Sequence, residues 1–204
     1  MKTSNPKIIL ASSSPRRQQI LSELGLSFSI IKPDIDEHID YYSPGAAARL
    51  AKDKAKKVSD EVNEECIIIA SDTIVTDGKN ILGKPKDKKD AERMLTLLSG
   101  RSHFVVSGIC LIDKRNDECY FDEETTIVIF RKLSKKQIIS YINTFEPFDK
   151  AGAYGIQGFG RLIVEKIDGC FFNVMGLPVG ILNTFLKKAG IDILEIAGGV
   201  NGSK

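Results

Sequence analysis

A short apolar run that ends abruptly in polar residues is the feature that most constrains this chain. Residues 7–11 have the length and branching of a buried strand, and Ser12-Ser13-Ser14-Pro15-Arg16-Arg17 follows at once. Ser14 and Pro15 predict the N-cap and first residue of a helix, because proline loses no needed hydrogen bond there. Free backbone N–H groups, hydroxyls and two guanidiniums then meet at a strand end, which favours phosphate binding. An ordinary capped helix with solvated arginines is the alternative.

The composition indicates an ordinary globular protein. The chain has 204 residues, 42% of them hydrophobic and 27% charged, and a net charge of +2 that does not favour nucleic-acid binding. No apolar run approaches the roughly 20 residues that span a membrane, and the N-terminus lacks a signal-peptide core. Two histidines and widely spaced cysteines exclude a His-rich metal site, so carboxylates and water would hold any metal. We expect a cytoplasmic protein without nucleic-acid or membrane partners.

Strand and helix patterns alternate along the chain and predict an α/β fold around a central mixed, twisted sheet flanked by helices. The predicted strands are residues 7–11, 27–31, 66–70, 104–112, 125–130 and 162–166, with a hairpin turn at Asp77-Gly78. The predicted helices are residues 15–24, a helix capped at Ser43-Pro44 that runs to about 58, residues 87–98 and 134–143, and one after Pro178. With no repeat and no Pro/Ser-rich linker, residues 1–204 are expected to form a single domain with two lobes around a cleft and a frayed tail from about 198.

Two carboxylates are candidates for chemistry. Asp72 directly follows the uninterrupted apolar strand, and open α/β sheets place ligand sites beyond strand ends. A carboxylate there can activate water or bind a divalent ion. Glu37 belongs to an acidic cluster with Asp34 and Asp36 that can hold Mg²⁺ or Mn²⁺ through oxygen. The competing interpretations are a strand-end Asp that caps a turn and an acidic loop that is simply solvated.

Two lysines are candidates for binding anions. Lys54 lies off the helix face that Lys52 and Lys56 share, which favours it for the edge of a cleft. The second lysine stands in Gly83-Lys84-Pro85, where its neighbours restrict the local backbone and can aim its ammonium. Solvated surface lysines are the alternative in both cases.

Glycines are concentrated in residues 152–160, around Gln157, whose amide offers both a donor and an acceptor. These glycines permit close backbone approach to a ligand, but their spacing matches neither the dinucleotide nor the Walker motif. Ser12 to Ser14 lack a G-x-S-x-G context, and hardly any histidine is present to act as base. Serine hydrolysis is therefore rejected.

Several spaced motifs together closely resemble those of the Maf family. They run in family order from about residue 8 to 190, so the resemblance covers almost the whole chain. The motifs are Ala11-Ser12-Ser13-Ser14-Pro15-Arg16-Arg17, Arg49-Leu50-Ala51-Lys52-Asp53-Lys54-Ala55, Ser71-Asp72-Thr73-Ile74-Val75, Gly83-Lys84-Pro85, Leu98-Ser99-Gly100, the stretch from Asp149 to Gly158, and Gly176-Leu177-Pro178.

The resemblance implies a nucleoside triphosphate pyrophosphatase, a hydrolase acting on acid anhydrides that releases the monophosphate and pyrophosphate. It implies a divalent cation (Mg²⁺, Mn²⁺ or Co²⁺) and an α/β fold like that of the inosine triphosphatases. By motif position, the predicted residues are Asp72 as proton acceptor, with Glu37, Lys54 and Lys84 also catalytic, Glu37 and Asp72 as metal ligands, and Ser12 and Arg17 as substrate contacts.

Three positions separate the branches of the family, and here they are Arg16, Thr73 and Gln157. This set is similar to that of the branch acting on dTTP and UTP. A thymine or uracil edge alternates carbonyl acceptors with one N–H donor, so Gln157 can answer both, and Arg16 and Thr73 can donate to carbonyls. A guanine-type edge would call for a carboxylate instead.

The resemblance leaves more than one role open. The first hypothesis is a house-cleaning dTTP/UTP pyrophosphatase, which can extend to modified pyrimidine nucleotides. The second is a nucleotide-binding regulator of cell division that needs no turnover. The sequence leaves open the physiological substrate, the preferred metal and the oligomeric state, a homodimer included.

Overall fold

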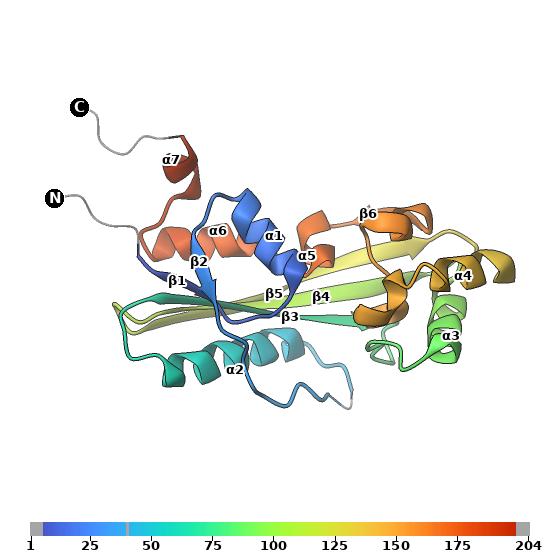
Figure 1. Cartoon of the computed structure of the whole chain (residues 1–204), viewed down its shortest axis with the longest axis horizontal. Coiled ribbons are helices and arrows are strands. Elements are labelled where there is room, and N and C mark those ends of the chain that lie inside the picture. Colours follow the sequence, from blue (N-terminus) through green and yellow to red (C-terminus); the bar gives the residue numbers. More distant parts are fainter. Residues whose placement is uncertain (1–5, 40, 199–204) are drawn as a thin grey trace.

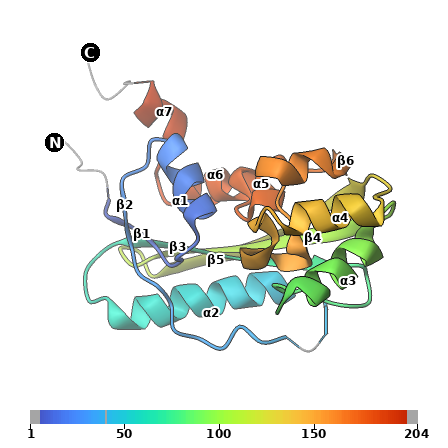
Figure 2. The same cartoon turned by 45° about the vertical axis from the view of Figure 1, so that its right-hand side comes forward.

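The computed structural model describes residues 6–39 and 41–198, which form a mixed sheet with helices on both faces (Figures 1 and 2). The strands are β1 (Ile8–Leu10), β2 (Phe28–Ile30), β3 (Ile67–Thr76), β4 (Ser102–Asp113), β5 (Glu118–Phe130) and β6 (Val164–Asp168). The helices are α1 (Pro15–Glu23), α2 (Ala46–Glu61), α3 (Lys88–Leu98), α4 (Lys135–Ile142), α5 (Phe171–Met175), α6 (Val179–Lys188) and α7 (Ile193–Ala197), and the 3₁₀ segments are η1 (Glu146–Asp149), η2 (Ala151–Ala153) and η3 (Gly158–Leu162). The predicted α/β class with a central mixed sheet is confirmed.

The strand order places an open edge beside the middle of β3. The order is β2-β1-β3-β4-β5-β6, with β1 parallel to β2 and β3 and the remaining pairs antiparallel. Strand β1 ends at Leu10, opposite Ile69, whereas β3 continues to Thr76. The prediction that Asp72 follows the end of its strand is therefore wrong, because pairing with β4 extends β3 through that residue. Asp72 nevertheless lies just beyond the end of β1, where a cavity can form.

Strand β1 is buried on both faces. The side chains of Ile8 and Leu10 pack with those of α1 and α6, whereas Ile9 packs with those of α2. Figure 1 shows α1 and α6 on one face of the sheet and α2 on the other. Because every residue of such a strand meets apolar neighbours, its sequence is an uninterrupted apolar run rather than an alternating one.

A separate apolar cluster lies at the other end of the long strands. It combines Val75 of β3, Val105 of β4 and Val128 of β5 with residues of α3 and α4. Strands β3, β4 and β5 thus run from the apolar cluster that contains Ile8 and Leu10 to this second cluster. Helices α3 and α4 lie at the far end of the sheet from β1 and β2 (Figure 1). This arrangement agrees with the two lobes expected from the sequence.

Helix α2 lies unusually close to the sheet. A Cβ atom added to Gly108 of β4 would fall 2.1 Å from the carbonyl carbon and oxygen of Ala47. The predicted cap at Ser43-Pro44 is wrong, since Gly45 is the N-cap, with a φ of 80°. The Glu123 carboxylate of β5 accepts hydrogen bonds from the backbone N–H groups of Gly45 and Ala48, at 2.6 and 3.3 Å. A side chain from the sheet thus caps the helix, which sequence-local signals cannot reveal.

Other differences from the sequence predictions concern element ends and short helices. Strand β5 begins at Glu118 rather than at 125, because its polar first half pairs with β4 along its whole length. Strand β6 starts at Val164, since residues up to Leu162 form η3. The short helices α5 and α7 lacked a sequence signal. Apart from Gly198, the tail predicted to fray lies outside the described residues. Within the described ranges, no helix has the length and apolar character needed to cross a membrane.

Replacing Gly108 with alanine is expected to destabilise the fold, because the added methyl group would collide with the backbone of α2. Overpacking of this kind costs about 1–3 kcal/mol, and more where backbone must move. Urea denaturation followed by circular dichroism measures the change in unfolding free energy. The matched control is Gly180→Ala in α6, where an added Cβ meets nothing within 4 Å. Equal stability of both variants would contradict the close approach of α2 to the sheet.

Candidate active site

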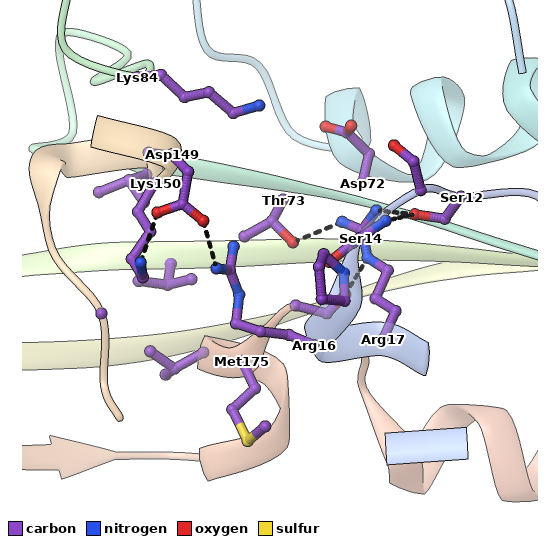
Figure 3. Close-up of a pocket in the computed structure, with 18 of the residues that line it drawn as sticks. Ser12, Ser14, Arg16, Arg17, Asp72, Thr73, Lys84, Asp149, Lys150 and Met175 are labelled. Carbon is purple, nitrogen blue, oxygen red and sulfur yellow. Dashed lines mark hydrogen bonds and ion pairs between the residues drawn. The ribbon is translucent and has the colours of Figure 1, made fainter. Parts of the chain in front are cut away.

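A cavity of about 350 Å³ opens beyond the end of β1, between that end of the sheet and the segment that follows η1 (Figure 3). Its walls come from the β1–α1 turn, α2, β3, η1, η2 and the end of α5. The structure brings together every site residue predicted from the sequence. These residues are Ser12, Arg16, Arg17, Glu37, Lys54, Asp72, Thr73, Lys84 and Gln157.

Arg17 is buried at the base of the cavity and is held in three directions. Its Nε donates to the Gly176 carbonyl at 2.8 Å, Nη1 to Ser12 Oγ at 3.1 Å, and Nη2 to Thr73 Oγ1 at 3.2 Å. Burial lowers the pKa of this guanidinium from its ordinary value, and the charge of Asp72 opposes the shift. The group remains cationic at neutral pH. Three of its five N–H groups are used in these bonds, so two remain for an anionic ligand.

Ser12 keeps its hydroxyl proton available to a ligand. Its Oγ accepts hydrogen bonds from Arg17 Nη1 and from the backbone N–H of Ser14, at 3.1 and 3.2 Å. Ser14 is the N-cap residue of α1 as predicted, with Pro15 at the first helical position, but its side chain makes no capping bond. The first-turn N–H groups of α1 are therefore not covered by a side chain from this residue. Together with Arg17, they suit an anion.

Thr73 belongs to a directional chain of hydrogen bonds. Its Oγ1 accepts from Arg17 and lies 2.9 Å from Ser107 Oγ, whose own proton goes to the Asn173 carbonyl at 2.8 Å. Because a hydroxyl has one proton, Thr73 must donate to Ser107. In this arrangement the Thr73 proton is not available for the carbonyl of a base. Thr73 here fixes the orientation of Arg17.

Lys54 joins the two predicted carboxylates. It is 4% exposed, and its Nζ lies 2.6 Å from Asp72 Oδ1 and 2.8 Å from Glu37 Oε1. A buried ammonium is tolerated when opposite charges pair with it, and both partners here are acidic. Lys52 instead stacks on the Phe121 ring at 4.2 Å, and Lys56 is exposed. Lys54, whose position on the helix differs from those of Lys52 and Lys56, thus also differs from them in its surroundings.

The two carboxylates fit a hard divalent cation. Both face the same ammonium, and these contacts use only one oxygen of each, which leaves Asp72 Oδ2 and Glu37 Oε2 as donors. Mg²⁺ is typically bound by one or two carboxylates, with water and substrate phosphates completing its shell. In the described part of the chain, no group of three or more His, Cys, Asp or Glu residues could hold a metal. A cation at this place would therefore depend on the substrate for further oxygen ligands.

The cavity rim carries the predicted Lys84 together with other charges to which the sequence assigned no role. Lys84 and Lys32 are exposed and line the cavity. Across it, Asp149 Oδ2 accepts from Arg16 Nη1 at 3.4 Å and Asp149 Oδ1 from Lys150 Nζ at 2.5 Å (Figure 3). Asp149 and Lys150 lie in one of the family-like motifs, but the sequence predicted no catalytic or binding role for either. Lys32 lies next to Pro33 without any local pattern that distinguishes it from a surface lysine.

Tyr154 forms part of the cavity wall and rests on a buried histidine. His103 Nε2 lies 2.7 Å from Tyr154 Oη, and the two rings meet edge to face, with centroids 5.3 Å apart. Burial lowers the pKa of His103 to about 4, and its Nδ1 has no hydrogen-bond partner in the described chain. The neutral imidazole is thus part of the apolar core behind the site rather than a catalytic base.

Comparison with a solved structure agrees with the fold. The structure of the Staphylococcus aureus Ham1 protein matches with a TM-score of 0.51 and 17% identity, over 90% of this chain and 99% of that one. At this identity the likeness concerns the fold alone. It agrees with the α/β architecture that was expected.

Sequence relatives are much closer. A dTTP/UTP pyrophosphatase of Caldicellulosiruptor saccharolyticus is 46% identical over 194 residues, which cover 93% of this chain and 98% of that protein. A dTTP/UTP pyrophosphatase of Clostridium perfringens is 47% identical over 193 residues, or 92% of this chain and all of that protein. The family described as Maf-like protein matches residues 7–189.

The fold and the cavity define an α/β protein whose site combines cationic side chains with paired carboxylates. The chain belongs to the Maf family. Its family membership confirms the resemblance drawn from the spaced motifs. The roles of the individual residues stay predictions, and the geometry above shows which of them can act together.

Replacing His103 with phenylalanine is expected to weaken the pH dependence of stability. The folded-state pKa of about 4 lies below the ordinary 6.5, so the unfolded chain binds more protons between these values. His103 therefore lowers stability as pH falls from 6.5 toward 4, by at most about 1.4 kcal/mol per pH unit. Urea titrations at several pH values measure this slope for both proteins. Parallel curves for wild type and His103→Phe would contradict a buried, neutral histidine.

Proposed function

We propose that this protein is a nucleoside triphosphate pyrophosphatase that hydrolyses dTTP and UTP to the monophosphate and pyrophosphate. The observation that carries the proposal is the convergence, in one cavity, of a buried guanidinium and the Lys54–Asp72–Glu37 cluster. The relatives named dTTP/UTP pyrophosphatase, 46–47% identical over nearly their whole length, support the same substrates.

The cations of the cavity suit a triphosphate. Such a ligand carries about four negative charges, so several cations are needed to hold it and to stabilise the leaving pyrophosphate. Arg17 has two free N–H groups for phosphate oxygens, and Ser12 can donate its proton. Lys84 acts as a point charge at the rim. Because Arg17 is already fixed by three hydrogen bonds, little reorganisation accompanies binding.

Asp72 is the proposed proton acceptor. Lys54 holds Asp72 Oδ1, so the orientation of the carboxylate in the cavity is set. Asp72 would orient the attacking water and take up its proton as the water oxygen bonds to the α-phosphorus and the α–β anhydride bond breaks, releasing pyrophosphate. Glu37 and Asp72 would hold a divalent cation, which lowers the pKa of water and neutralises phosphate charge when bound. Lys54 limits the repulsion between the two carboxylates whether or not the cation is present.

Gln157 and Arg16 are the proposed base-reading residues. Both line the cavity, on segments different from the one that carries Asp72. The Gln157 amide can donate to a carbonyl of thymine or uracil and accept from the N3–H group. Arg16 can donate to the second carbonyl once a ligand competes with Asp149 for its guanidinium. Thr73 would contribute to the site by orienting Arg17, because its own proton is donated to Ser107.

The same proposal includes the remaining expectations. The partners would be a nucleoside triphosphate and Mg²⁺, Mn²⁺ or Co²⁺, without nucleic acid or membrane, in the cytoplasm. A homodimer stays a prediction, which a measurement of the molecular mass in solution would test. The net charge of +2 supports a protein that acts on small anions without binding nucleic acid generally.

A nucleotide panel tests the function. We expect pyrophosphate release from dTTP and UTP in the presence of a divalent cation, lower rates with CTP and 7-methyl-GTP, and loss of turnover when EDTA removes the metal. The assay follows pyrophosphate with Mg²⁺, Mn²⁺ or Co²⁺ in turn. Saturable binding of dTTP without any turnover would instead favour the nucleotide-binding regulator of cell division.

Substituting Asp72 with asparagine is expected to lower kcat by about 10²–10⁴-fold while nucleotide binding persists, because the variant keeps shape but cannot accept a proton. The measurements are kcat with dTTP and dTTP affinity by calorimetry. The matched control is Asp60→Asn, the same change at an exposed position near the end of α2. Near-normal kcat in the Asp72 variant would rule out this residue as the base and make Glu37 the next candidate.

A further inference from the structure

Glu146, at the start of η1, anchors the loop that carries Gln157. We define residues 155–160 as the Gln157 loop. The Glu146 carboxylate accepts three hydrogen bonds: from Tyr141 Oη at 2.9 Å, from the Phe159 backbone N–H at 2.7 Å, and from the Gly160 backbone N–H at 3.0 Å. Two of its donors thus belong to the C-terminal half of this loop.

The first half of the loop is attached to the same carboxylate through Tyr141. The Gly155 backbone N–H donates to Tyr141 Oη at 3.2 Å, and Tyr141 in turn donates to Glu146 Oε1. Both ends of the loop are therefore tied to one side chain, with Gln157 between them. A hydrogen-bonded carboxylate of this kind holds backbone more firmly than a neutral acceptor, since bonds to a charged group are stronger.

The glycines of the loop fit this contact. Gly158 has a φ of +60°, and a Cβ there would lie 2.3 Å from Glu146 Oε2. A Cβ on Gly160 would lie 1.7 Å from the Gly155 carbonyl oxygen. The sequence predicted that these glycines let the backbone approach a ligand. At Gly158 the group approached is the Glu146 carboxylate instead.

Glu146 acts from outside the cavity. Neither Glu146 nor Tyr141 lines it, whereas Gln157 does. The Glu146 carbonyl also accepts from Lys150 Nζ at 2.7 Å, and Lys150 contacts Asp149, the partner of Arg16. One residue is thereby connected to both proposed base-reading side chains while it touches neither of them.

We propose that Glu146 is a positioning residue that sets base selectivity by holding the Gln157 loop in place. The inference rests on the proposed function, because it assumes that Gln157 reads the base. In the phosphate half of the site, Arg17 lies on α1, Lys54 on α2 and Asp72 on β3, and their hydrogen bonds and ion pairs do not involve this carboxylate. Loss of the anchor should therefore disturb base recognition and leave the phosphate half of the site intact.

The test is Glu146→Gln, which keeps the size of the side chain but places an amide donor against backbone N–H donors. We expect kcat/KM for dTTP and UTP to fall by about 5- to 150-fold, as for a mismatched buried hydrogen bond. With CTP and 7-methyl-GTP we expect a much smaller loss, so selectivity falls. Competitive inhibition by inorganic pyrophosphate, which probes only the phosphate half, should keep its inhibition constant.

Two further variants make the result specific. Tyr141→Phe removes a single bond to the carboxylate and the link to Gly155, so it should lower selectivity in the same direction by a smaller factor. Glu165→Gln on β6 makes the same charge change at an exposed position and should leave every value unchanged. Gln157→Ala serves as the reference, because it removes the side chain that is proposed to bind the base and so shows the selectivity that remains without it.

The outcomes separate the inference from the function on which it rests. A wild-type protein that does not prefer dTTP and UTP overturns the proposed function whatever Glu146 does. If the wild type shows the preference, unchanged selectivity in both Glu146→Gln and Tyr141→Phe overturns the positioning role. Equal losses with all four nucleotides, together with weaker pyrophosphate inhibition, also overturn it and leave Glu146 a merely structural residue.

Discussion

The ion pair of Lys54 with Asp72 is the interaction on which the rest of the site depends. A buried ammonium needs an acidic partner, and the 2.6 Å contact provides it only because α2 lies close against β3 and β4. That approach requires Gly108, since any side chain there would meet the backbone of Ala47. Small residues in the sheet and the helix therefore determine where a charged pair can form. Burial of this pair stabilises little by itself, but it fixes the orientation of the carboxylate that is proposed to handle the water.

A second network fixes Arg17 and connects distant parts of the chain. The Gly176 carbonyl accepts from Arg17 Nε, and Ser71 Oγ lies 2.8 Å from this carbonyl and 2.7 Å from that of Gly108, so the two carbonyls share its single proton. The turn after α5 is thereby joined to the middle of β3 and β4. A guanidinium held on three sides keeps its position when an anion arrives, which favours strong electrostatic binding. The part of the cavity around Arg17 is thus anchored on the sheet itself.

The opposite wall has a different construction. It consists of 3₁₀ segments and glycine-rich turns whose position depends on side chains such as Glu146 and Tyr141. Of the proposed phosphate and catalytic groups, Arg17, Lys54 and Asp72 thus lie on helices or on a long strand, whereas the base-reading Gln157 lies on a loop. Substitutions in such a loop can alter selectivity without disturbing the sheet, because its anchors are few and local. This division gives a physical reason why one fold can serve nucleotides that differ only in the base.

The sequence by itself determined the fold class, the strand–turn–helix at Ser12 to Arg17 and the set of residues around the cavity, because these depend on local patterns and on spaced family motifs. Tertiary structure alone decided what each side chain touches. The extension of β3 through Asp72 came from pairing with β4, and the cap of α2 came from Glu123, 78 residues away from Gly45. The Thr73 proton was directed to Ser107 by a bond to Asn173, and the Gly158 turn was shaped by Glu146. Contacts between residues so far apart in the chain leave no periodic or local signature, so only the folded arrangement of the strands and loops specifies them.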